Sequence, residues 1–205
     1  MQKKLFTHMA SSPSTGLTDG LLGEISMAVQ PNMSVRGWPT EAGSRALEGF
    51  TVIYDATVIE RLKQAGATLK GSICMSEFGF GLSGDTGAMV LHTGDVDSVL
   101  ITDTLGEARM AACMAGVIGF KPSFGVVSRF GLIGLVPSME CFGILAKQLD
   151  DIANVMSVVV GNDARDLSMP EFGTGLELPN FDRVFETDAP IRTCGIIKEC
   201  LEILG

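Results

Sequence analysis

The chain has 205 residues, of which 46% are apolar and only 19% charged, so it can bury a sizeable core and is not an intrinsically disordered protein. Its formal net charge of −9 argues against a protein that holds nucleic acid directly by neutralising phosphates. No run reaches the ~18 consecutive apolar residues of a membrane-spanning helix, so we expect no membrane association.

The cysteines and histidines point to a reducing compartment without a metal site. The chain has an odd number of cysteines without a CxxC pair, which favours the cytoplasm over a disulfide framework. The two histidines, His8 and His92, are far apart and lack ligand-like spacing, so we expect no bound metal and no cofactor. The five cysteines are Cys74, Cys113, Cys141, Cys194 and Cys200.

The first 20 residues are polar and contain Ser, Pro and Gly, which predicts a flexible N-terminal arm. Two lysines occur near the start, but no apolar segment follows them, so we expect no signal peptide. From Leu21 to Val29 the sequence LLGEISMAV turns apolar and predicts a buried strand. We therefore expect one domain over residues 21–205.

A helix followed by a strand is predicted between Asp55 and Met75. Asp55 is a good helix N-cap, and Gly66 stands where a helix commonly ends. The strand ATLKGSICM follows, rich in β-branched and apolar residues. This helix–glycine–strand order is half of a βαβ unit and predicts an α/β fold with a largely parallel sheet. The apolar residues that recur at helical spacing are Val58, Ile59, Leu62 and Ala65.

The segment from Ile101 to Leu132 carries the strongest functional signal. A strand ends in the polar turn at 102–104, and Gly106 and Glu107 then open an Ala- and Met-rich helix. Backbone N–H groups at such a helix start favour negative charge and can stabilise an oxyanion. By itself, Glu107 is better accounted for as a first-turn acid that complements the helix dipole, because acids are enriched there.

Eleven residues of this segment fall without a gap into the pattern Ser-Asp-Thr-Gly-Gly-Ser-Ile-Arg, then a helix, then Gly-x-x-Gly-x-Lys-Pro-Thr-x-Gly-x-x-Ser-x-x-Gly. They are Asp103, Thr104, Gly106, Arg109, Gly116, Gly119, Lys121, Pro122, Gly125, Ser128 and Gly131. On these residues the chain resembles the amidase signature family, and within it most closely the A subunits of glutamyl-tRNA(Gln) amidotransferases.

The resemblance spans Leu21 to Glu199 and corresponds to about the first half of a full-length family member. It implies an α/β/α sandwich with a mixed, largely parallel central sheet, truncated to the N-terminal half. Downstream matches include residues 138–145, where Glu140 replaces the family Asp, and residues 161–168, GNDARDLS, which we expect to form a loop. Residues 148–160 have the apolar stripe of a helix, and residues 171–190 are acidic and irregular.

The resemblance also implies where a Ser-Ser-Lys triad would lie, and this chain replaces every member. Gln30 stands in the place of the Lys base, and an amide takes no proton near neutral pH. Gly84 stands in the place of the bridging Ser, with Ser83 next to it in a shortened glycine-rich loop. Glu107 stands in the place of the nucleophile, and a carboxylate cannot replace the Ser hydroxyl in forming and releasing the ester intermediate.

The oxyanion turn of the family corresponds to Thr104, Leu105 and Gly106, and Leu105 replaces a glycine there. A Leu side chain at this point would crowd the approach of a substrate carbonyl. Scaffold positions of the motif are retained while the chemical groups are lost.

Three hypotheses follow. The preferred one is a catalytically degenerate amidase-like protein, a scaffold or regulatory subunit with a protein partner or a second copy of itself, because a truncated sheet leaves an open edge and an apolar face. The alternatives are an amide hydrolase or amidotransferase subunit that works through displaced residues such as Ser83 or through a partner chain, and a gene fragment without function.

Overall fold

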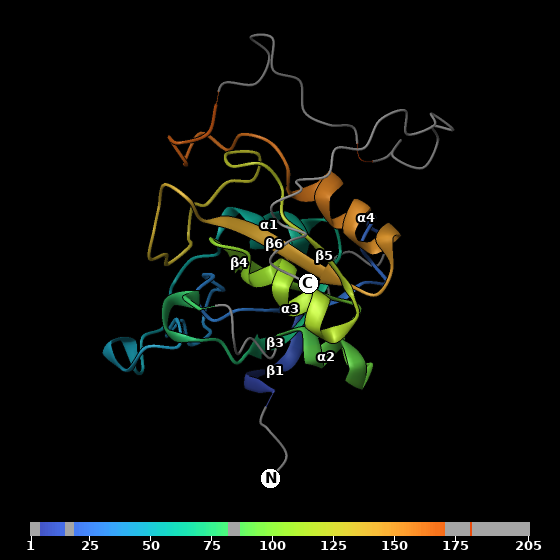
Figure 1. Ribbon diagram of the computed structural model, residues 1–205, viewed down its shortest axis with the longest axis horizontal. Helices are drawn as coiled ribbons and strands as arrows, with labels where there is room; N and C mark the ends of the chain where they lie inside the picture. The colour runs from blue at the N-terminus through green and yellow to red at the C-terminus, as the bar shows by residue number, and fades with distance from the viewer. Residues whose placement is uncertain (1–4, 15–18, 82–86, 171–180, 182–205) are drawn as a thin grey trace, which may run out of the picture.

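The computed structural model describes residues 5–14, 19–81, 87–170 and 181 (Figure 1). The strands are β1 Phe6–Ser14, β2 Ser26–Val29, β3 Thr68–Ile73, β4 Ser98–Asp103, β5 Ile118–Phe120 and β6 Cys141–Ala146. The helices are α1 Thr57–Gln64, α2 Gly87–Thr93, α3 Glu107–Ala115 and α4 Leu149–Val159, with short 3-10 turns at Arg45–Leu47 and Glu77–Gly79.

The strands form one sheet in the order β1-β3-β2-β4-β6-β5. Parallel pairing is confined to the three central strands, because β3 pairs with β2 and β2 with β4 in parallel. The flanking pairs β1–β3, β4–β6 and β5–β6 are antiparallel. The sheet is therefore mixed, with a parallel centre.

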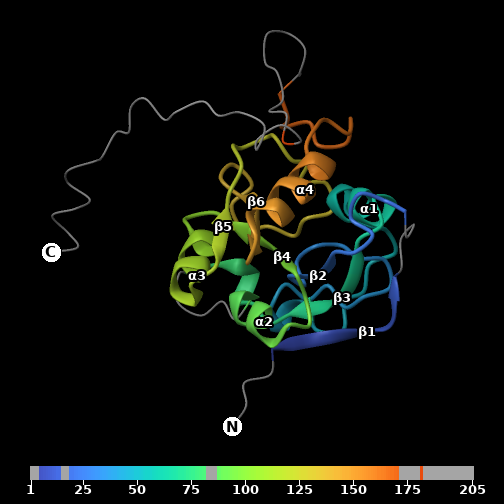
Figure 2. The same ribbon diagram turned by 90° about the vertical axis from the view of Figure 1, so that its right-hand side faces the viewer.

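Helices cover both faces of this sheet. On one face α1 and α4 pack together over a core that includes Ile59, Leu100 and Met156. On the opposite face α2 and α3 cover a second core that includes Leu91 and Ile101. Figure 2 shows the two helix pairs on either side of the sheet, which is the α/β/α arrangement expected from the sequence.

The expected N-terminal arm is corrected by the structure. Residues Phe6–Ser14 form β1, which pairs antiparallel with β3 from Phe6↔Ile73 to Ser14↔Leu69. The polar Ser and Pro content concealed this strand, because an edge strand tolerates residues that a central strand does not. The His8 ring on this strand lies 5.0 Å from the Trp38 ring, centroid to centroid.

The helix expected after Asp55 begins at Thr57, and its N-cap is Ala56 instead of Asp55. The Asp55 carboxylate accepts a hydrogen bond from the Arg36 N–H at 2.7 Å and pairs with the Lys63 ammonium at 2.8 Å. The strand expected over residues 21–29 is shorter than the apolar run, since β2 begins only at Ser26. The helices expected at Glu107 and over residues 148–160 are confirmed as α3 and α4.

Two glycines let α3 lie close to the sheet. A Cβ on Gly119 of β5 would lie 2.5 Å from the Ala112 Cβ, and one on Gly143 of β6 would lie 2.5 Å from the Ala108 Cβ. Distances this short are not tolerated between carbon atoms, so both positions need glycine. This contact fixes the position of α3 and of the turn that precedes it.

Candidate functional site

The site lies at one edge of the sheet, where β2 and β4 end. The two strands run parallel and in register, with Val29 opposite Leu100. Gln30 follows β2 directly, and the turn at 104–106 leads from β4 into α3. Because parallel strands end at the same edge, residues far apart in sequence meet there.

The carboxylate of Glu107 is bound by the backbone of this turn. Its Oε2 accepts hydrogen bonds from the N–H groups of Thr104 at 2.8 Å, Leu105 at 2.7 Å and Gly106 at 3.1 Å. Glu107 is 3% exposed, and its Oε1 has no hydrogen-bond partner among the residues the structure describes. The donors that the resemblance assigns to an oxyanion are thus occupied by a side chain of the protein itself.

The turn itself needs glycine at one position and leaves Leu105 open to solvent. Gly106 has a φ of 127°, a conformation that L side chains rarely adopt. The Leu105 side chain is 52% exposed, whereas its N–H group points to the Glu107 carboxylate. Backbone donors and the acid that occupies them therefore form one local unit.

Gln30 holds the end of β2 against β4. Its side-chain carbonyl accepts hydrogen bonds from the N–H of Thr102 at 2.7 Å and from the hydroxyl of Thr102 at 3.0 Å. The Asn32 amide lies 3.4 Å from the same hydroxyl, and Gln30 and Asn32 are both buried. A neutral amide in this network joins the two strands by hydrogen bonds, but it cannot act as a base near neutral pH.

An ion pair braces the turn from its other side. Asp103 is fully buried, and its two oxygens accept hydrogen bonds from Nε of Arg109 at 3.0 Å and from Nη2 at 2.9 Å. Such bidentate contacts fix geometry as well as supplying energy. The retained Asp and Arg of the motif therefore hold the start of α3 in place.

The remaining motif residues support the segment after α3. Gly116 ends α3 in the left-handed conformation, with a φ of 66°. Lys121 Nζ donates to the Pro122 carbonyl at 2.9 Å and lies 3.5 Å from Cys141 Sγ. Gly125 has a φ of 78°, and a Cβ there would lie 2.8 Å from Pro170 Cδ. These positions are structural and lie outside the turn of Glu107.

The structure places two of the three expected triad positions at this edge. Gln30 and Glu107 both lie at the strand ends described above. Gly84 and the neighbouring Ser83 lie outside the described residues. Their role in any chemistry stays a prediction.

Sequence reasoning did not anticipate the polar network around Asp163. This carboxylate accepts hydrogen bonds from the hydroxyls of Thr57 and Ser128 and from the N–H groups of Arg165 at 2.9 Å and Asp166 at 3.0 Å. Burial raises the pKa of Asp163, but these bonds outweigh it and hold the pKa well below its ordinary value. In the sequence, Ser128 and the segment GNDARDLS each match the family pattern, but nothing in the sequence indicates that the two would meet.

Two further findings concern metal ligands and membrane-spanning helices. Within the ranges 5–14, 19–81, 87–170 and 181, no group of three or more His, Cys, Asp or Glu side chains is placed to hold a metal ion. No helix in the described part of the chain combines the length and apolar character that crossing a bilayer requires.

Comparison with known proteins identifies the family. The amidase family model matches residues 6–95 and 96–189. The A subunit of glutamyl-tRNA(Gln) amidotransferase from Haloarcula marismortui is 38% identical over 76% of this chain and 42% of the relative. The same protein of Methanospirillum hungatei is 35% identical over 94% of this chain and 52% of the relative.

A solved structure agrees with these relatives. The A subunit of glutamyl-tRNA(Gln) amidotransferase from Thermotoga maritima superposes with a TM-score of 0.73 at 29% identity, over 82% of this chain and 42% of that one. The chain spans about half the length of the curated relatives it matches. Since the family model covers most of its residues, the chain belongs to the amidase family.

Proposed function

We propose that this chain is a non-catalytic member of the amidase family that serves as a scaffold or regulatory subunit. The observation that carries the proposal is the Glu107 carboxylate, which accepts hydrogen bonds from the N–H groups of Thr104, Leu105 and Gly106. An oxyanion formed on a substrate carbonyl needs the same donors. With a buried anion already bound there, the developing charge would meet repulsion in place of stabilisation.

The other chemical requirements of amide hydrolysis are also unmet at the matched positions. A carboxylate at 107 is not a substitute for a Ser hydroxyl, because the family reaction passes through an ester. The amide of Gln30 cannot remove a proton from a nucleophile near neutral pH. Substitution of one group could be compensated from nearby, but nucleophile, base and oxyanion donors are altered together.

The subunit role is supported by exposed apolar groups on α3 and β5 and by the relatives. Met110 and Met114 on α3 are 42% and 74% exposed, and Ile118 on the edge strand β5 is 36% exposed. Apolar groups gathered at a sheet edge commonly mark protein contacts. The matched relatives are A subunits of amidotransferases, and the chain spans about half their length. We propose that a protein partner, or a second copy of the chain, contacts α3 and β5.

The proposed absence of amidase activity is tested with a fluorophosphonate probe and a panel of primary amides. Intact-mass measurement after incubation with the probe should show no covalent adduct, and ammonia release from the amides should equal that of buffer. A catalytically competent amidase, treated in parallel, controls for reagent quality. An adduct mapped by peptide sequencing to Ser83 would overturn the proposal and favour hydrolysis through a displaced nucleophile.

A further inference from the structure

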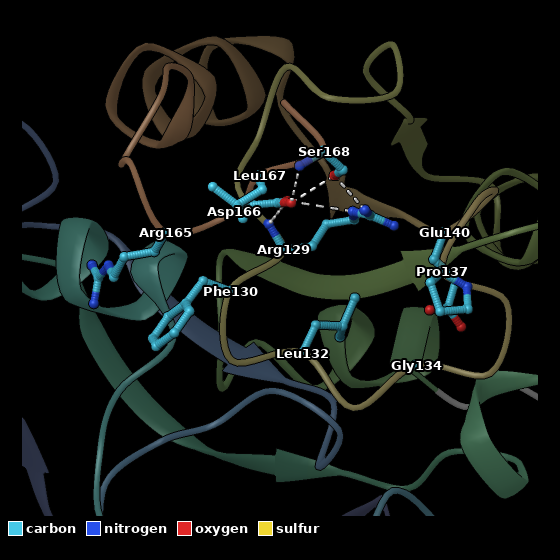
Figure 3. Close-up of a pocket in the computed structure, with 10 residues that line it drawn as sticks. All are labelled: Arg129, Phe130, Leu132, Gly134, Pro137, Glu140, Arg165, Asp166, Leu167 and Ser168. Carbon is cyan, nitrogen blue, oxygen red and sulfur yellow. Dashed lines mark hydrogen bonds and ion pairs between the residues drawn. The ribbon is translucent and has the colours of Figure 1, made fainter. Parts of the chain in front are cut away.

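A cavity of about 430 Å³ lies away from the turn of Glu107, between the loop that joins β5 to β6 and the loop after α4 (Figure 3). Arg129 and residues 166–168 lie on one side of it, Glu140 on the other, and Leu132 between them. The cavity is therefore lined by two cationic side chains, Arg129 and Arg165, by two anionic ones, Glu140 and Asp166, and by an apolar floor at Leu132.

Glu140 is the most informative group in this cavity. It is 2% exposed, and its Oε1 accepts a hydrogen bond from the Leu135 N–H at 2.6 Å. Among the ion pairs of the described residues, none involves Glu140. A carboxylate removed from water without a cationic partner is costly, and a positively charged group bound in the cavity would lower that cost.

The backbone is shaped to hold this carboxylate in place. A Cβ on Gly134 would lie 1.7 Å from the Glu140 Oε2, so the carboxylate can occupy its position only because residue 134 is glycine. The second oxygen of Glu140 therefore has a fixed position at the wall of the cavity.

Arg129 faces it from the opposite side and is held by three contacts. Its Nη2 donates to the Ser168 hydroxyl, its Nε lies 3.4 Å from Asp166 Oδ2, and its guanidinium lies 4.5 Å from the centroid of the Phe124 ring. Its Nη1 has no hydrogen-bond partner among the described residues, and Figure 3 shows this end of the guanidinium directed toward the side where Glu140 lies. Arg129 and Glu140 do not pair with each other, and both line the cavity.

We propose that this cavity binds a free α-amino acid as its zwitterion. The ammonium group donates to Glu140 Oε2, the carboxylate accepts from Arg129 Nη1, and an apolar side chain lies against Leu132 and Pro137. Charge selects the zwitterion, because Glu140 repels a simple anion and Arg129 repels a simple cation. The proposal is independent of the function argued for the turn of Glu107, since the two sites share no residue.

The ligands for the test are three molecules with the same apolar body. L-Leucine carries both charges, 3-methylbutan-1-amine carries only the ammonium, and 4-methylpentanoate carries only the carboxylate. Calorimetric titration of the full chain should give an affinity for leucine at least about tenfold higher than for either analogue. Equal affinities for all three, or no heat with leucine at millimolar concentration, would overturn the proposal.

A matched pair of variants assigns the binding to the cavity. Glu140→Gln keeps an acceptor for the Leu135 N–H but removes the charge, and it should weaken leucine binding at least about tenfold. Glu41→Gln is the control, because Glu41 also accepts one backbone N–H, from Gly49 at 2.8 Å, and lies outside this cavity. Unchanged leucine binding by a folded Glu140→Gln variant would refute the assignment.

Should the Glu140→Gln variant fail to fold, the wild-type chain still decides the question. Nuclear Overhauser contacts between the methyl groups of bound leucine and those of Leu132 are expected, because the apolar floor of the cavity is formed there. Contacts only to methyl groups outside the cavity would overturn the proposal.

Discussion

A carboxylate that accepts hydrogen bonds from three backbone N–H groups stabilises the turn around it. Glu107 supplies an acceptor for the N–H groups of the turn that precedes α3, at Thr104, Leu105 and Gly106. Its negative charge also complements the positive end of the helix dipole. The carboxylate at position 107 therefore stabilises the turn that leads into α3.

Replacement of Glu107 by Ala should destabilise the fold by about 2–3 kcal/mol, because the N–H groups of Thr104, Leu105 and Gly106 lose a charged acceptor. Glu107→Gln, which keeps an acceptor oxygen, should lose less. Urea unfolding followed by circular dichroism measures both. Equal stability of wild type and Glu107→Ala would show that these bonds contribute nothing.

The hydrogen bonds of Asp163 predict a specific dependence of stability on pH. They hold its pKa in the folded chain below the unfolded value of about 3.9, so the ionised form stabilises the fold above that pH. This contribution is lost as the pH falls below about 4 toward the folded-state pKa. The wild-type melting temperature should therefore drop steeply on acidification in this range.

Asp163→Asn isolates this contribution. At neutral pH the variant should be less stable by about 2 kcal/mol, since the bonds from Thr57 and Ser128 lose their charged acceptor. Its melting temperature should fall less than that of the wild type between about pH 6 and pH 3. Parallel curves for the two proteins would contradict the assignment of the pH dependence to Asp163.

Sequence patterns located Glu107 at a helix start, because the residues that favour a helix start are neighbours in the sequence. They could not locate the Asp163 network, which joins Thr57 of α1 to residues more than 100 positions away. Glu140 was noted only as a replacement for Asp. Its burial opposite Arg129 depends on how the loop between β5 and β6 folds and meets the loop after α4, and spacing along the chain does not encode that arrangement.

At the scale of elements, the close contact between α3 and the sheet sets the position of the candidate site. Gly119→Ala would introduce a Cβ 2.5 Å from the Ala112 Cβ, so α3 must shift. We expect a loss of about 1–3 kcal/mol in the free energy of unfolding. Chemical denaturation of the variant measures it.

A double variant tests the cause of that loss. Ala112→Gly removes the opposing methyl group, and alone it should cost about 1 kcal/mol through helix propensity. Combined with Gly119→Ala, it should recover part of the loss, giving a favourable coupling energy. If the two substitutions have strictly additive effects on the free energy of unfolding, the strain of Gly119→Ala does not arise from contact with the Ala112 methyl group.

The elements best predicted from the sequence are α4, whose apolar residues recur at helical spacing, and α3, which ends at a glycine. The strand that it missed, β1, has a composition typical of loops and forms by pairing with β3. Pairing with a distant strand is a tertiary effect that overrides local propensity. The same reason explains why the antiparallel flanks of the sheet were not distinguished from its parallel centre.

At the scale of the whole molecule, a net charge of −9 and exposed apolar groups on α3 and β5 act in opposite directions. Charge repulsion between copies weakens self-association at low salt, and added salt screens it. We expect light scattering after size exclusion to show dimers or larger species that increase with salt. A monodisperse monomer at all salt and protein concentrations would exclude a second copy of the chain as the partner and leave a different protein in that role.

The central claim is that the Glu107 carboxylate occupies the N–H groups of Thr104, Leu105 and Gly106 and closes this anion site. Nuclear magnetic resonance titration with acetate tests it through the amide shifts of these three residues. The account predicts no acetate-dependent shift in the wild type and saturable shifts in Glu107→Ala, whose donors are free. Saturable shifts at these amides in the wild type would contradict it.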